Sequence, residues 1–338
     1  MIIAVDAAGG DYAPYEIVKG AIKAARDYEV EIALVGKEKI LHVLAGRHLG
    51  KLGLSIVDAS QVIDFHEHPV EGVRNKPDSS IVVGTNLVRD GVASAFISAG
   101  NTGAVLYAAL SILGKIKGVE RPAIGTLINI SVTSPVLLID SGANADCRPD
   151  HLVQFAQLGT TYSREILGLS SPKVGLLNNG GEAGKGNHLT KETYDFLKKT
   201  SMNFVGNIEG HDLANGKANV IVTDGFTGNV VLKTLEGLGD TFLKLRQVGQ
   251  VVSKAYHRQG RASLLEVGLS SLARRMDYRE YGGASLLGVN GNIIIAHGRS
   301  QARTIRNAVG LAKQSIDRGI CEKIKEVEYE QTSSSTGC

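Results

Sequence analysis

Six short segments of the chain combine glycine with small polar side chains, and each follows an apolar run: 6–11, 98–103, 140–146, 178–187, 225–229 and 298–300. Glycine lets the backbone come close to a ligand, and free N–H groups at a helix start attract negative charge. Any one segment can equally be a tight turn without a ligand. Six of them together favour a shared cleft for an anion such as phosphate.

The standard motifs for nucleotides and for the common hydrolases are absent. No GxxxxGK[ST], GxGxxG, GxSxG or HExxH occurs, which argues against P-loop, dinucleotide, α/β-hydrolase and zinc-protease chemistry. His66 and His68 form a pair without further ligands nearby, which is typical of a solvated loop, so we predict no metal site. Cys147 can be a nucleophile or a packed thiol, and the lack of a suitably spaced partner favours the packed thiol.

Apolar runs of strand length alternate with segments of helical periodicity. The expected strands are 2–6, 31–36, 54–58, 95–98, 124–128, 136–140, 173–177, 203–205, 220–224 and 293–297. The expected helices are 15–28, 81–90, 102–113, 150–167, 191–200, 227–248 and 301–321. This alternation predicts an α/β fold with a mainly parallel sheet covered on both faces. Such sheets bind ligands at the carboxyl ends of their strands, where the six segments lie.

Composition and charge argue against several other classes of protein. Glycine makes up 41 of 338 residues, about 12% against a usual level of roughly 7%, and much of this excess lies in the six segments. Cys147, Cys321 and Cys338 form no CxxC pair, which indicates a reducing cytoplasm. The N-terminus lacks the basic region of a signal peptide, and no apolar stretch approaches the ~18 residues of a membrane span. A net charge of +3 is too small to indicate a nucleic-acid partner.

Longer stretches around the same segments resemble one known family. They are DAAGGDYAP at 6–14, DSSI at 78–81, SAGNTGA at 98–104, ERPAI at 120–124, DSGANADCRPDHLVQFA at 140–156, EAGKGN at 182–187, FVGNIEG at 204–210, TDGFTGNVVLKTLEG at 223–237, YGGASLLGVNG at 281–291 and IAHGRS at 295–300. On these stretches the chain resembles the PlsX family, the acyl-carrier-protein:phosphate acyltransferases, from residue 1 to about 325. It departs from the family at Ala8 and at Arg299, which adds a positive charge beside the expected cleft.

The resemblance implies a fold, an activity and partners. The fold is a three-layer α/β/α, Rossmann-like unit, similar to phosphotransacetylase and isopropylmalate dehydrogenase, in a homodimer. The reaction moves a long acyl chain from the thioester of acyl carrier protein to inorganic phosphate, with no cofactor. The acyl phosphate then serves a membrane glycerol-3-phosphate acyltransferase in phospholipid synthesis. We expect a cytoplasmic protein, peripherally associated with the inner face of the membrane.

The resemblance also points to site residues. Because phosphate is itself the nucleophile, the site must align it with the thioester carbonyl and stabilise an oxyanion. Lys185 and Asn229 are the expected catalytic residues, as cation and as amide donor. The expected phosphate- and substrate-binding residues are Asp6, Gly9, Gly10, Asp11, Arg74, Lys76, Ser98, Gly100, Asn101, Thr102, Gly103, Asp140, Asn144, Asp146, Thr227, Gly228 and His297. For Asp140, Asn144, Asp146 and His297 a structural role stays open, and Arg74 and Lys76 can be unspecific loop charges.

Residues 244–281 differ from the rest of the chain in charge. Eight Lys and Arg against three Asp and Glu give this segment a net +5, so the remainder carries −2. An apolar helix face with basic neighbours suits an anionic membrane surface, an acidic carrier protein or a packed dimer interface. The expected contact residues are Arg258, Arg261, Leu265, Leu269, Leu272, Arg274 and Arg275.

For the organisation of the chain, we predict one catalytic domain over 1–325, from which 244–281 projects, and a polar tail over 326–338. Two other functions remain open. The first is a phosphotransacetylase-like enzyme that uses acyl-CoA, and the second is a non-catalytic membrane-bound scaffold. Lys185, Asn229 and the glycine-rich segments argue against the scaffold.

Overall fold

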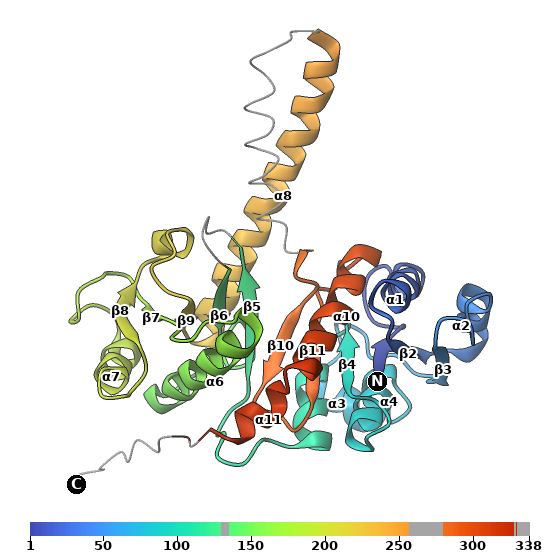
Figure 1. Cartoon of the computed structure of the whole chain (residues 1–338), viewed down its shortest axis with the longest axis horizontal. Coiled ribbons are helices and arrows are strands. Elements are labelled where there is room, and N and C mark those ends of the chain that lie inside the picture. Colours follow the sequence, from blue (N-terminus) through green and yellow to red (C-terminus); the bar gives the residue numbers. More distant parts are fainter. Residues whose placement is uncertain (130–134, 257–279, 328, 330–338) are drawn as a thin grey trace.

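A computed structural model describes residues 1–129, 135–256, 280–327 and 329 (Figure 1). Its strands are β1 (Ile2–Asp6), β2 (Glu31–Gly36), β3 (Leu54–Asp58), β4 (Ala95–Ser98), β5 (Ala123–Ile128), β6 (Val136–Ile139), β7 (Val174–Leu177), β8 (Phe204–Ile208), β9 (Val220–Val222), β10 (Ala284–Leu287) and β11 (Asn292–Ile295). They form one sheet in the order β3-β2-β1-β4-β11-β10-β5-β6-β9-β7-β8. Most strands bury both faces, as a sheet covered by helices on both sides requires.

The sheet is mainly parallel and reverses direction at its centre. β10 is antiparallel to both β11 and β5, and β5 is antiparallel to β6, whereas the other pairs are parallel. The half made of β3, β2, β1, β4 and β11 therefore runs opposite to the half made of β6, β9, β7 and β8. Along the strand direction, the carboxyl ends of the two sets of strands consequently lie at opposite ends of the sheet.

Helices cover the sheet on both faces (Figure 1). They are α1 (Tyr15–Tyr28), α2 (Glu38–Ala45), α3 (Pro69–Asn75), α4 (Ser80–Arg89), α5 (Thr102–Ala108), the π-helix η1 (Ala109–Leu113), α6 (Pro149–Leu167), α7 (His188–Leu197), the 3₁₀ helix η2 (Gly210–Ala214), α8 (Gly225–Tyr256), α10 (Ala302–Asp317) and α11 (Ile320–Lys325). Separate apolar clusters fill the two sides of each half. The predicted α/β class with a mainly parallel sheet is confirmed.

Several elements differ from the sequence prediction. The expected helix over 102–113 changes to π geometry at Ala109, and the one over 301–321 is divided at Gly319, whose φ is +62°. The strand expected at 203–205 extends to Ile208. The central strand β10 and the helices α2 and α3 were not predicted.

Helix α8 is the longest element and leaves the body of the molecule in Figure 1. The expected contact residues for carrier protein or membrane, from Arg258 to Arg275, lie outside the described residues, and so does the tail from residue 330. Among the described helices, none combines the length and the apolar character required to cross a bilayer. The single domain predicted over 1–325 stays a prediction.

Candidate functional site

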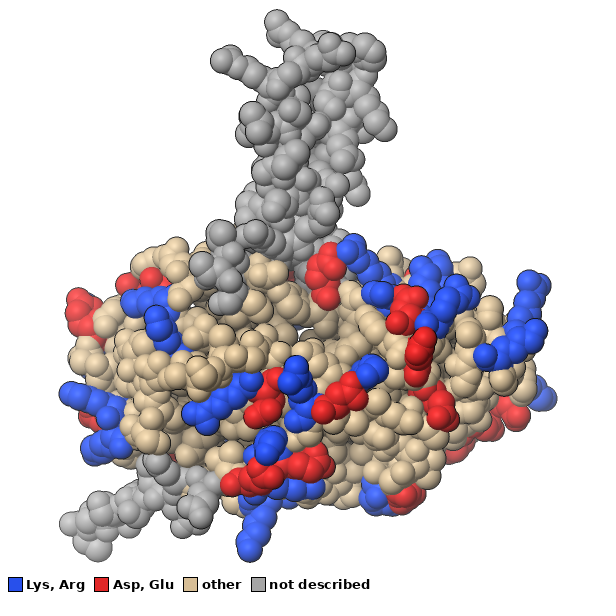
Figure 2. Space-filling view, in the orientation of Figure 1, with Lys and Arg blue, Asp and Glu red and all other residues tan. Residues whose placement is uncertain are grey.

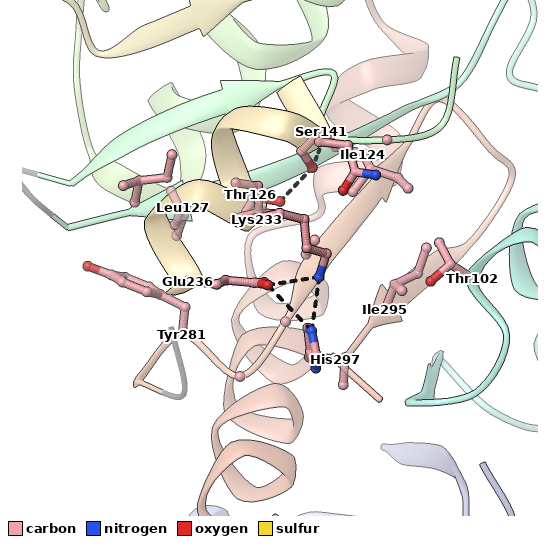
Figure 3. Close-up of a pocket in the computed structure, with 18 of the residues that line it drawn as sticks. Thr102, Ile124, Thr126, Leu127, Ser141, Lys233, Glu236, Tyr281, Ile295 and His297 are labelled. Atoms are coloured by element: carbon pink, nitrogen blue, oxygen red, sulfur yellow. Dashed lines mark hydrogen bonds and ion pairs between the residues drawn. The ribbon is translucent and has the colours of Figure 1, made fainter. Parts of the chain in front are cut away.

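A cavity of about 370 Å³ lies where the two halves of the sheet meet. Its walls come from β5, the start of β10, the end of β11, the start of α5 and the first turns of α8. Most of its lining is apolar, including Leu106 and Leu232. Ile124, Leu127 and Ile295 belong to the same lining (Figure 3). Polar side chains interrupt this lining, among them Thr102, Thr126, Ser141, Asn229, Lys233, Glu236 and His297. Cavities of this size and composition are typical small-molecule sites.

The first turn of α8 is fixed against the loop that follows β6. The side chain of Asp224 accepts hydrogen bonds from the backbone N–H and the hydroxyl of Thr227, both at 2.8 Å. Gly228 lies so close to this loop that a Cβ there would be 1.9 Å from the carbonyl oxygen of Asp140. This contact sets the position of Asn229, whose side chain lies beside Gly142 at the cavity wall.

Three ionisable side chains meet at the wall of the cavity (Figure 3). The Nζ atom of Lys233 is 2.8 Å from Oε2 of Glu236 and 2.9 Å from Nε2 of His297. Nε2 of His297 is also 3.4 Å from Oε2 of Glu236. The Glu236 side chain is only 7% exposed, whereas that of Lys233 is 53% exposed. One buried carboxylate therefore holds the side chains of Lys233 and His297 together.

The protonation of Glu236 follows from these contacts. Burial alone would raise the pKa of its carboxyl group, but hydrogen bonds from His297 and Lys233 outweigh burial and lower this pKa below 4.5. The carboxylate is therefore ionised at neutral pH. Its negative charge lies at the cavity wall, beside Lys233 and His297.

The carboxylate of Asp6, the last residue of β1, holds the following loop in a closed turn. Asp6 is buried and accepts hydrogen bonds from the N–H groups of Ala8 and Gly9, and from the hydroxyl of Ser98 at 2.6 Å. Burial raises the pKa of Asp6. A Cβ on Gly9 would be 2.8 Å from the nitrogen of Gly100, so these two loops pack backbone against backbone. Asp6 and Ser98 thus connect two loops, and neither lines the cavity.

The loop after β6 is organised in the same way. Oδ1 of Asp140 accepts from the backbone N–H groups of Ile124, Gly142 and Ala143, and Oδ2 accepts from the N–H and side-chain amide of Asn144. That amide also donates to the carbonyl of Pro122 at 2.8 Å. Asp140 and Asn144 therefore shape the loop that supplies Ser141 and Gly142 to the cavity, while Asp146 is exposed.

Other predicted phosphate ligands hold loops together. The side-chain amide of Asn101 donates to carbonyl groups of Asp64, Phe65 and Glu67, and its oxygen accepts from the N–H of Ala104 at the start of α5. Lys76 binds the carboxylate of Glu67 at 2.5 Å. These polar atoms fix the loop over 64–67 beside α5.

Arg74 and Asp11 also have contacts within the fold. The Nε–H of Arg74 donates to the hydroxyl of Tyr107 at 3.0 Å. The N–H of Asp11 donates to the carbonyl of Gly298 at 2.8 Å, beside Gly10, whose φ is +111°. The loop after β1 is thereby joined to the loop after β11.

Lys185 lies in the loop after β7, which does not line the cavity. Its backbone carbonyl accepts from the side-chain amide of Asn178 at 3.0 Å, and its alkyl chain lies over Gly180. The side chain is exposed, and its ammonium has no hydrogen bond or ion pair to any residue that the structure describes. Of the predicted site residues, the cavity brings together Thr102, Gly103, Asn229 and His297.

Two further groups of side chains could in principle be reactive. Burial raises the pKa of Cys147 to about 12, so its thiol stays protonated at neutral pH, as a packed thiol would. Glu120, Asp150 and His151 lie within metal-binding distance of one another, but the guanidinium of Arg148 contacts both carboxylates. An internal ion-pair network explains this second cluster.

Lys233 and Glu236 are the site residues that sequence reasoning missed. They follow Asn229 at positions i+4 and i+7, so the three share one face of α8 with Leu232. Helical periodicity applied to all of TDGFTGNVVLKTLEG would have placed both residues on the same helix face as Asn229. Thr126, whose hydroxyl oxygen is 2.6 Å from that of Ser141, comes from the short apolar strand β5 and gave no such signal; Ser141 lies in the glycine-rich segment 140–146 but was not singled out.

Solved structures with a similar architecture define the class of fold. EutD phosphotransacetylase from Staphylococcus aureus aligns with a TM-score of 0.57 at 16% identity, covering 93% of this chain and 94% of that one. A branched-chain phosphotransacylase from Enterococcus faecalis aligns with a TM-score of 0.59 at 14% identity, covering 94% and 99%. The chain therefore has a phosphotransacetylase-like α/β fold.

Sequence comparison gives the family. The model of the family described as "Fatty acid synthesis protein" matches residues 1–323. A phosphate acyltransferase of Dehalococcoides mccartyi is 58% identical over 336 residues, covering 99% of this chain and 97% of that protein. One of Desulforamulus reducens is 51% identical over 325 residues, covering 96% of each. The chain belongs to this fatty acid synthesis family, the PlsX family of phosphate acyltransferases.

Proposed function

We propose that the protein transfers a long acyl chain from the thioester of acyl carrier protein to inorganic phosphate, and that the acyl phosphate enters phospholipid synthesis. The cavity between the two half-sheets carries this proposal. Its apolar lining suits an acyl chain, and two of its polar side chains, Asn229 and Lys233, come from the first turns of α8. Membership of the phosphate acyltransferase family supports the same reaction.

In this reaction a phosphate oxygen attacks the thioester carbonyl, so the protein needs no nucleophile of its own. Asn229 is proposed to donate its amide N–H to the carbonyl oxygen as negative charge develops there. Lys185 is proposed to neutralise phosphate from its exposed loop after β7. Thr102 is proposed as a further hydroxyl donor at the start of α5, whereas the hydroxyl of Thr227, also expected to bind phosphate, donates to Asp224.

The direct test mixes the protein with palmitoyl carrier protein and phosphate and follows release of the carrier thiol. Lys185→Ala and Asn229→Ala should each lower turnover at least ~100-fold, the scale of losing one oxyanion donor. Lys191→Ala changes an exposed lysine of the neighbouring helix α7 and should leave turnover unchanged. Near-normal turnover by Lys185→Ala would refute the role of that residue, and absence of phosphate-dependent release by the wild type would refute the function.

Acyl-CoA is the competing thioester donor. The structural similarity to phosphotransacetylases is the observation that favours this alternative, although the similarity concerns the fold alone. Parallel assays with palmitoyl carrier protein and palmitoyl-CoA at equal concentration separate the two. A higher kcat/KM with palmitoyl-CoA would overturn the proposal of a carrier-protein donor.

The remaining proposals concern where the protein acts and what it contacts. We propose a cytoplasmic homodimer at the inner face of the membrane, on the basis of the basic residues over 244–281 and the family resemblance. Leu269→Glu with Leu272→Glu should abolish flotation with anionic vesicles, because charge on the apolar helix face that the sequence predicts opposes insertion. Flotation equal to that of the wild type would exclude this segment as the membrane contact.

A further inference from the structure

The contact between Lys233 and His297 sets a condition on their protons. The backbone N–H of Arg299 donates to Nδ1 of His297 at 3.0 Å, so a neutral ring carries its proton on Nε2. That same Nε2 lies 2.9 Å from Nζ of Lys233. An ammonium and an Nε2–H are both donors, and two donors do not form a hydrogen bond with each other. One nitrogen therefore accepts from the other, and the pair shares a proton.

Glu236 holds this pair in place. Its buried Oε2 is 2.8 Å from Nζ of Lys233 and 3.4 Å from Nε2 of His297. The carboxylate comes from α8 and the imidazole from the end of β11, so the contact joins two elements across the cavity (Figure 3). Both nitrogens belong to residues that line the cavity, where they can reach a bound substrate.

Among the described residues, the other ionisable groups near Lys233, Glu236 and His297 are already paired or stay neutral. The guanidinium of Arg299 is paired with Asp240 at 3.2 Å, and Arg303 is paired with Glu280. Burial raises the pKa of the Tyr281 hydroxyl to about 12, so this cavity-lining group stays neutral. The space-filling view shows basic and acidic side chains interspersed over the body, without a large field of one sign on that face (Figure 2).

We propose that Lys233 and His297 form the proton relay of the reaction and that Glu236 is the residue that positions them. This inference rests on the proposed function. An oxygen of hydrogen phosphate forms a bond to the thioester carbonyl carbon. The carbon–sulfur bond then breaks with its electrons on sulfur, and the pair gives its shared proton to the thiolate. The proton still bound to the transferred phosphate then passes to the pair and restores it. The products are acyl phosphate and a thiol.

The leaving group provides the test. An alkyl thiolate, with a thiol pKa near 8.5, gains from protonation as it leaves, whereas an aryl thiolate is a much weaker base and leaves without a proton. His297→Gln and Lys233→Met should each lower kcat/KM for an alkyl palmitoyl thioester at least ~100-fold, the scale of general acid catalysis. For the palmitoyl ester of thiophenol the loss should be below ~5-fold. Lys313→Met, which removes an ion pair with Asp317 on α10, is the matched control.

Glu236 is tested by the pH profile. A carboxylate beside the pair favours its protonated form, so without this carboxylate the pair holds its proton less firmly. With Glu236→Gln the alkaline fall of kcat should move to lower pH by about one unit, and Glu236→Asp should restore most of the shift. A structural role alone would lower kcat without moving the profile.

The outcomes separate this inference from the proposed function. Equal losses for both thioesters in an active protein, or an unmoved pH profile in Glu236→Gln, overturn the relay and leave the function standing. A wild-type protein that forms no acyl phosphate from either thioester overturns both. Selective loss with the alkyl thioester, together with the shifted profile, supports the relay.

Discussion

A single methyl group added at Gly228 should displace site residues on α8 while the protein still folds, so that its effects on activity and on stability can be measured separately. A Cβ at this residue would be 1.9 Å from the carbonyl oxygen of Asp140 and 3.1 Å from a side-chain methyl of Thr223. An ordinary contact needs about 3.4 Å, so the first turn of α8 must move away from the β6 loop by about 1.5 Å. Asn229 and Lys233 move with it.

A displacement of about 1 Å at a reacting group costs roughly 100-fold in rate, so Gly228→Ala should lower kcat/KM for acyl phosphate formation by ~100-fold or more. The free energy of unfolding should fall by about 1–3 kcal/mol from overpacking, partly offset by the better helix propensity of alanine. Steady-state kinetics of thiol release and urea unfolding measure the two effects.

Gly237→Ala is the matched control on the same helix. Nothing lies within 4 Å of a Cβ at Gly237, which is exposed. This variant should keep wild-type kinetics and gain up to ~1 kcal/mol in stability. If Gly228→Ala retains half of the wild-type kcat/KM, or if Gly237→Ala loses as much activity, the close approach at Gly228 does not position the site.

Three further predictions concern individual side chains. Asp140→Ala leaves five N–H donors without their acceptor and should cost ~4 kcal/mol or more in urea unfolding; a loss under ~1 kcal/mol would contradict this. Cys147, whose pKa burial raises to about 12, should react with iodoacetamide at pH 8 at least ~100-fold more slowly in the native than in the urea-unfolded chain, and equal rates would refute its burial. Because the folded pKa of Glu236 lies below 4.5, its ionisation stabilises the fold above that pH and this contribution is lost as pH falls through the folded pKa. Glu236→Gln should therefore destabilise the protein at pH 7 and have little effect at pH 3.

Periodicity predicted the elements whose burial pattern is regular. The helix expected at 15–28 coincides with α1, because its apolar residues recur on one face that packs against the sheet and α10. Strand β10 escaped prediction because its four residues lie between glycines, within YGGASLLGVNG, and resemble a loop. The reversal at β10, β5 and β6 depends on pairing between distant segments, which local periodicity does not encode.

Glycine-rich segments at strand ends and helix starts predicted several of the residues that line the cavity, whereas other lining residues gave no such signal. Asn229, Thr102 and His297 do line one cavity. The amide of Asn101 and the ammonium of Lys76 were expected to bind phosphate. In the structure they contact the loop over 64–67, and their phosphate-binding role stays a prediction. A polar side chain near a strand end can serve a ligand or a neighbouring loop, and only the fold decides which. The role of Lys185 stays a prediction.

The central strands have a consequence for the order in which the protein is made. β10 and β11 lie between β4 and β5, so hydrogen bonding between the half-sheet of residues 2–98 and the half-sheet of residues 123–222 runs through residues 284–295. His297 follows directly after them. Each half can begin to fold as it leaves the ribosome, since segments fold in the order of synthesis. The cavity and its proton-sharing pair come into existence only when nearly the whole chain has been translated, so an incomplete chain carries no working site.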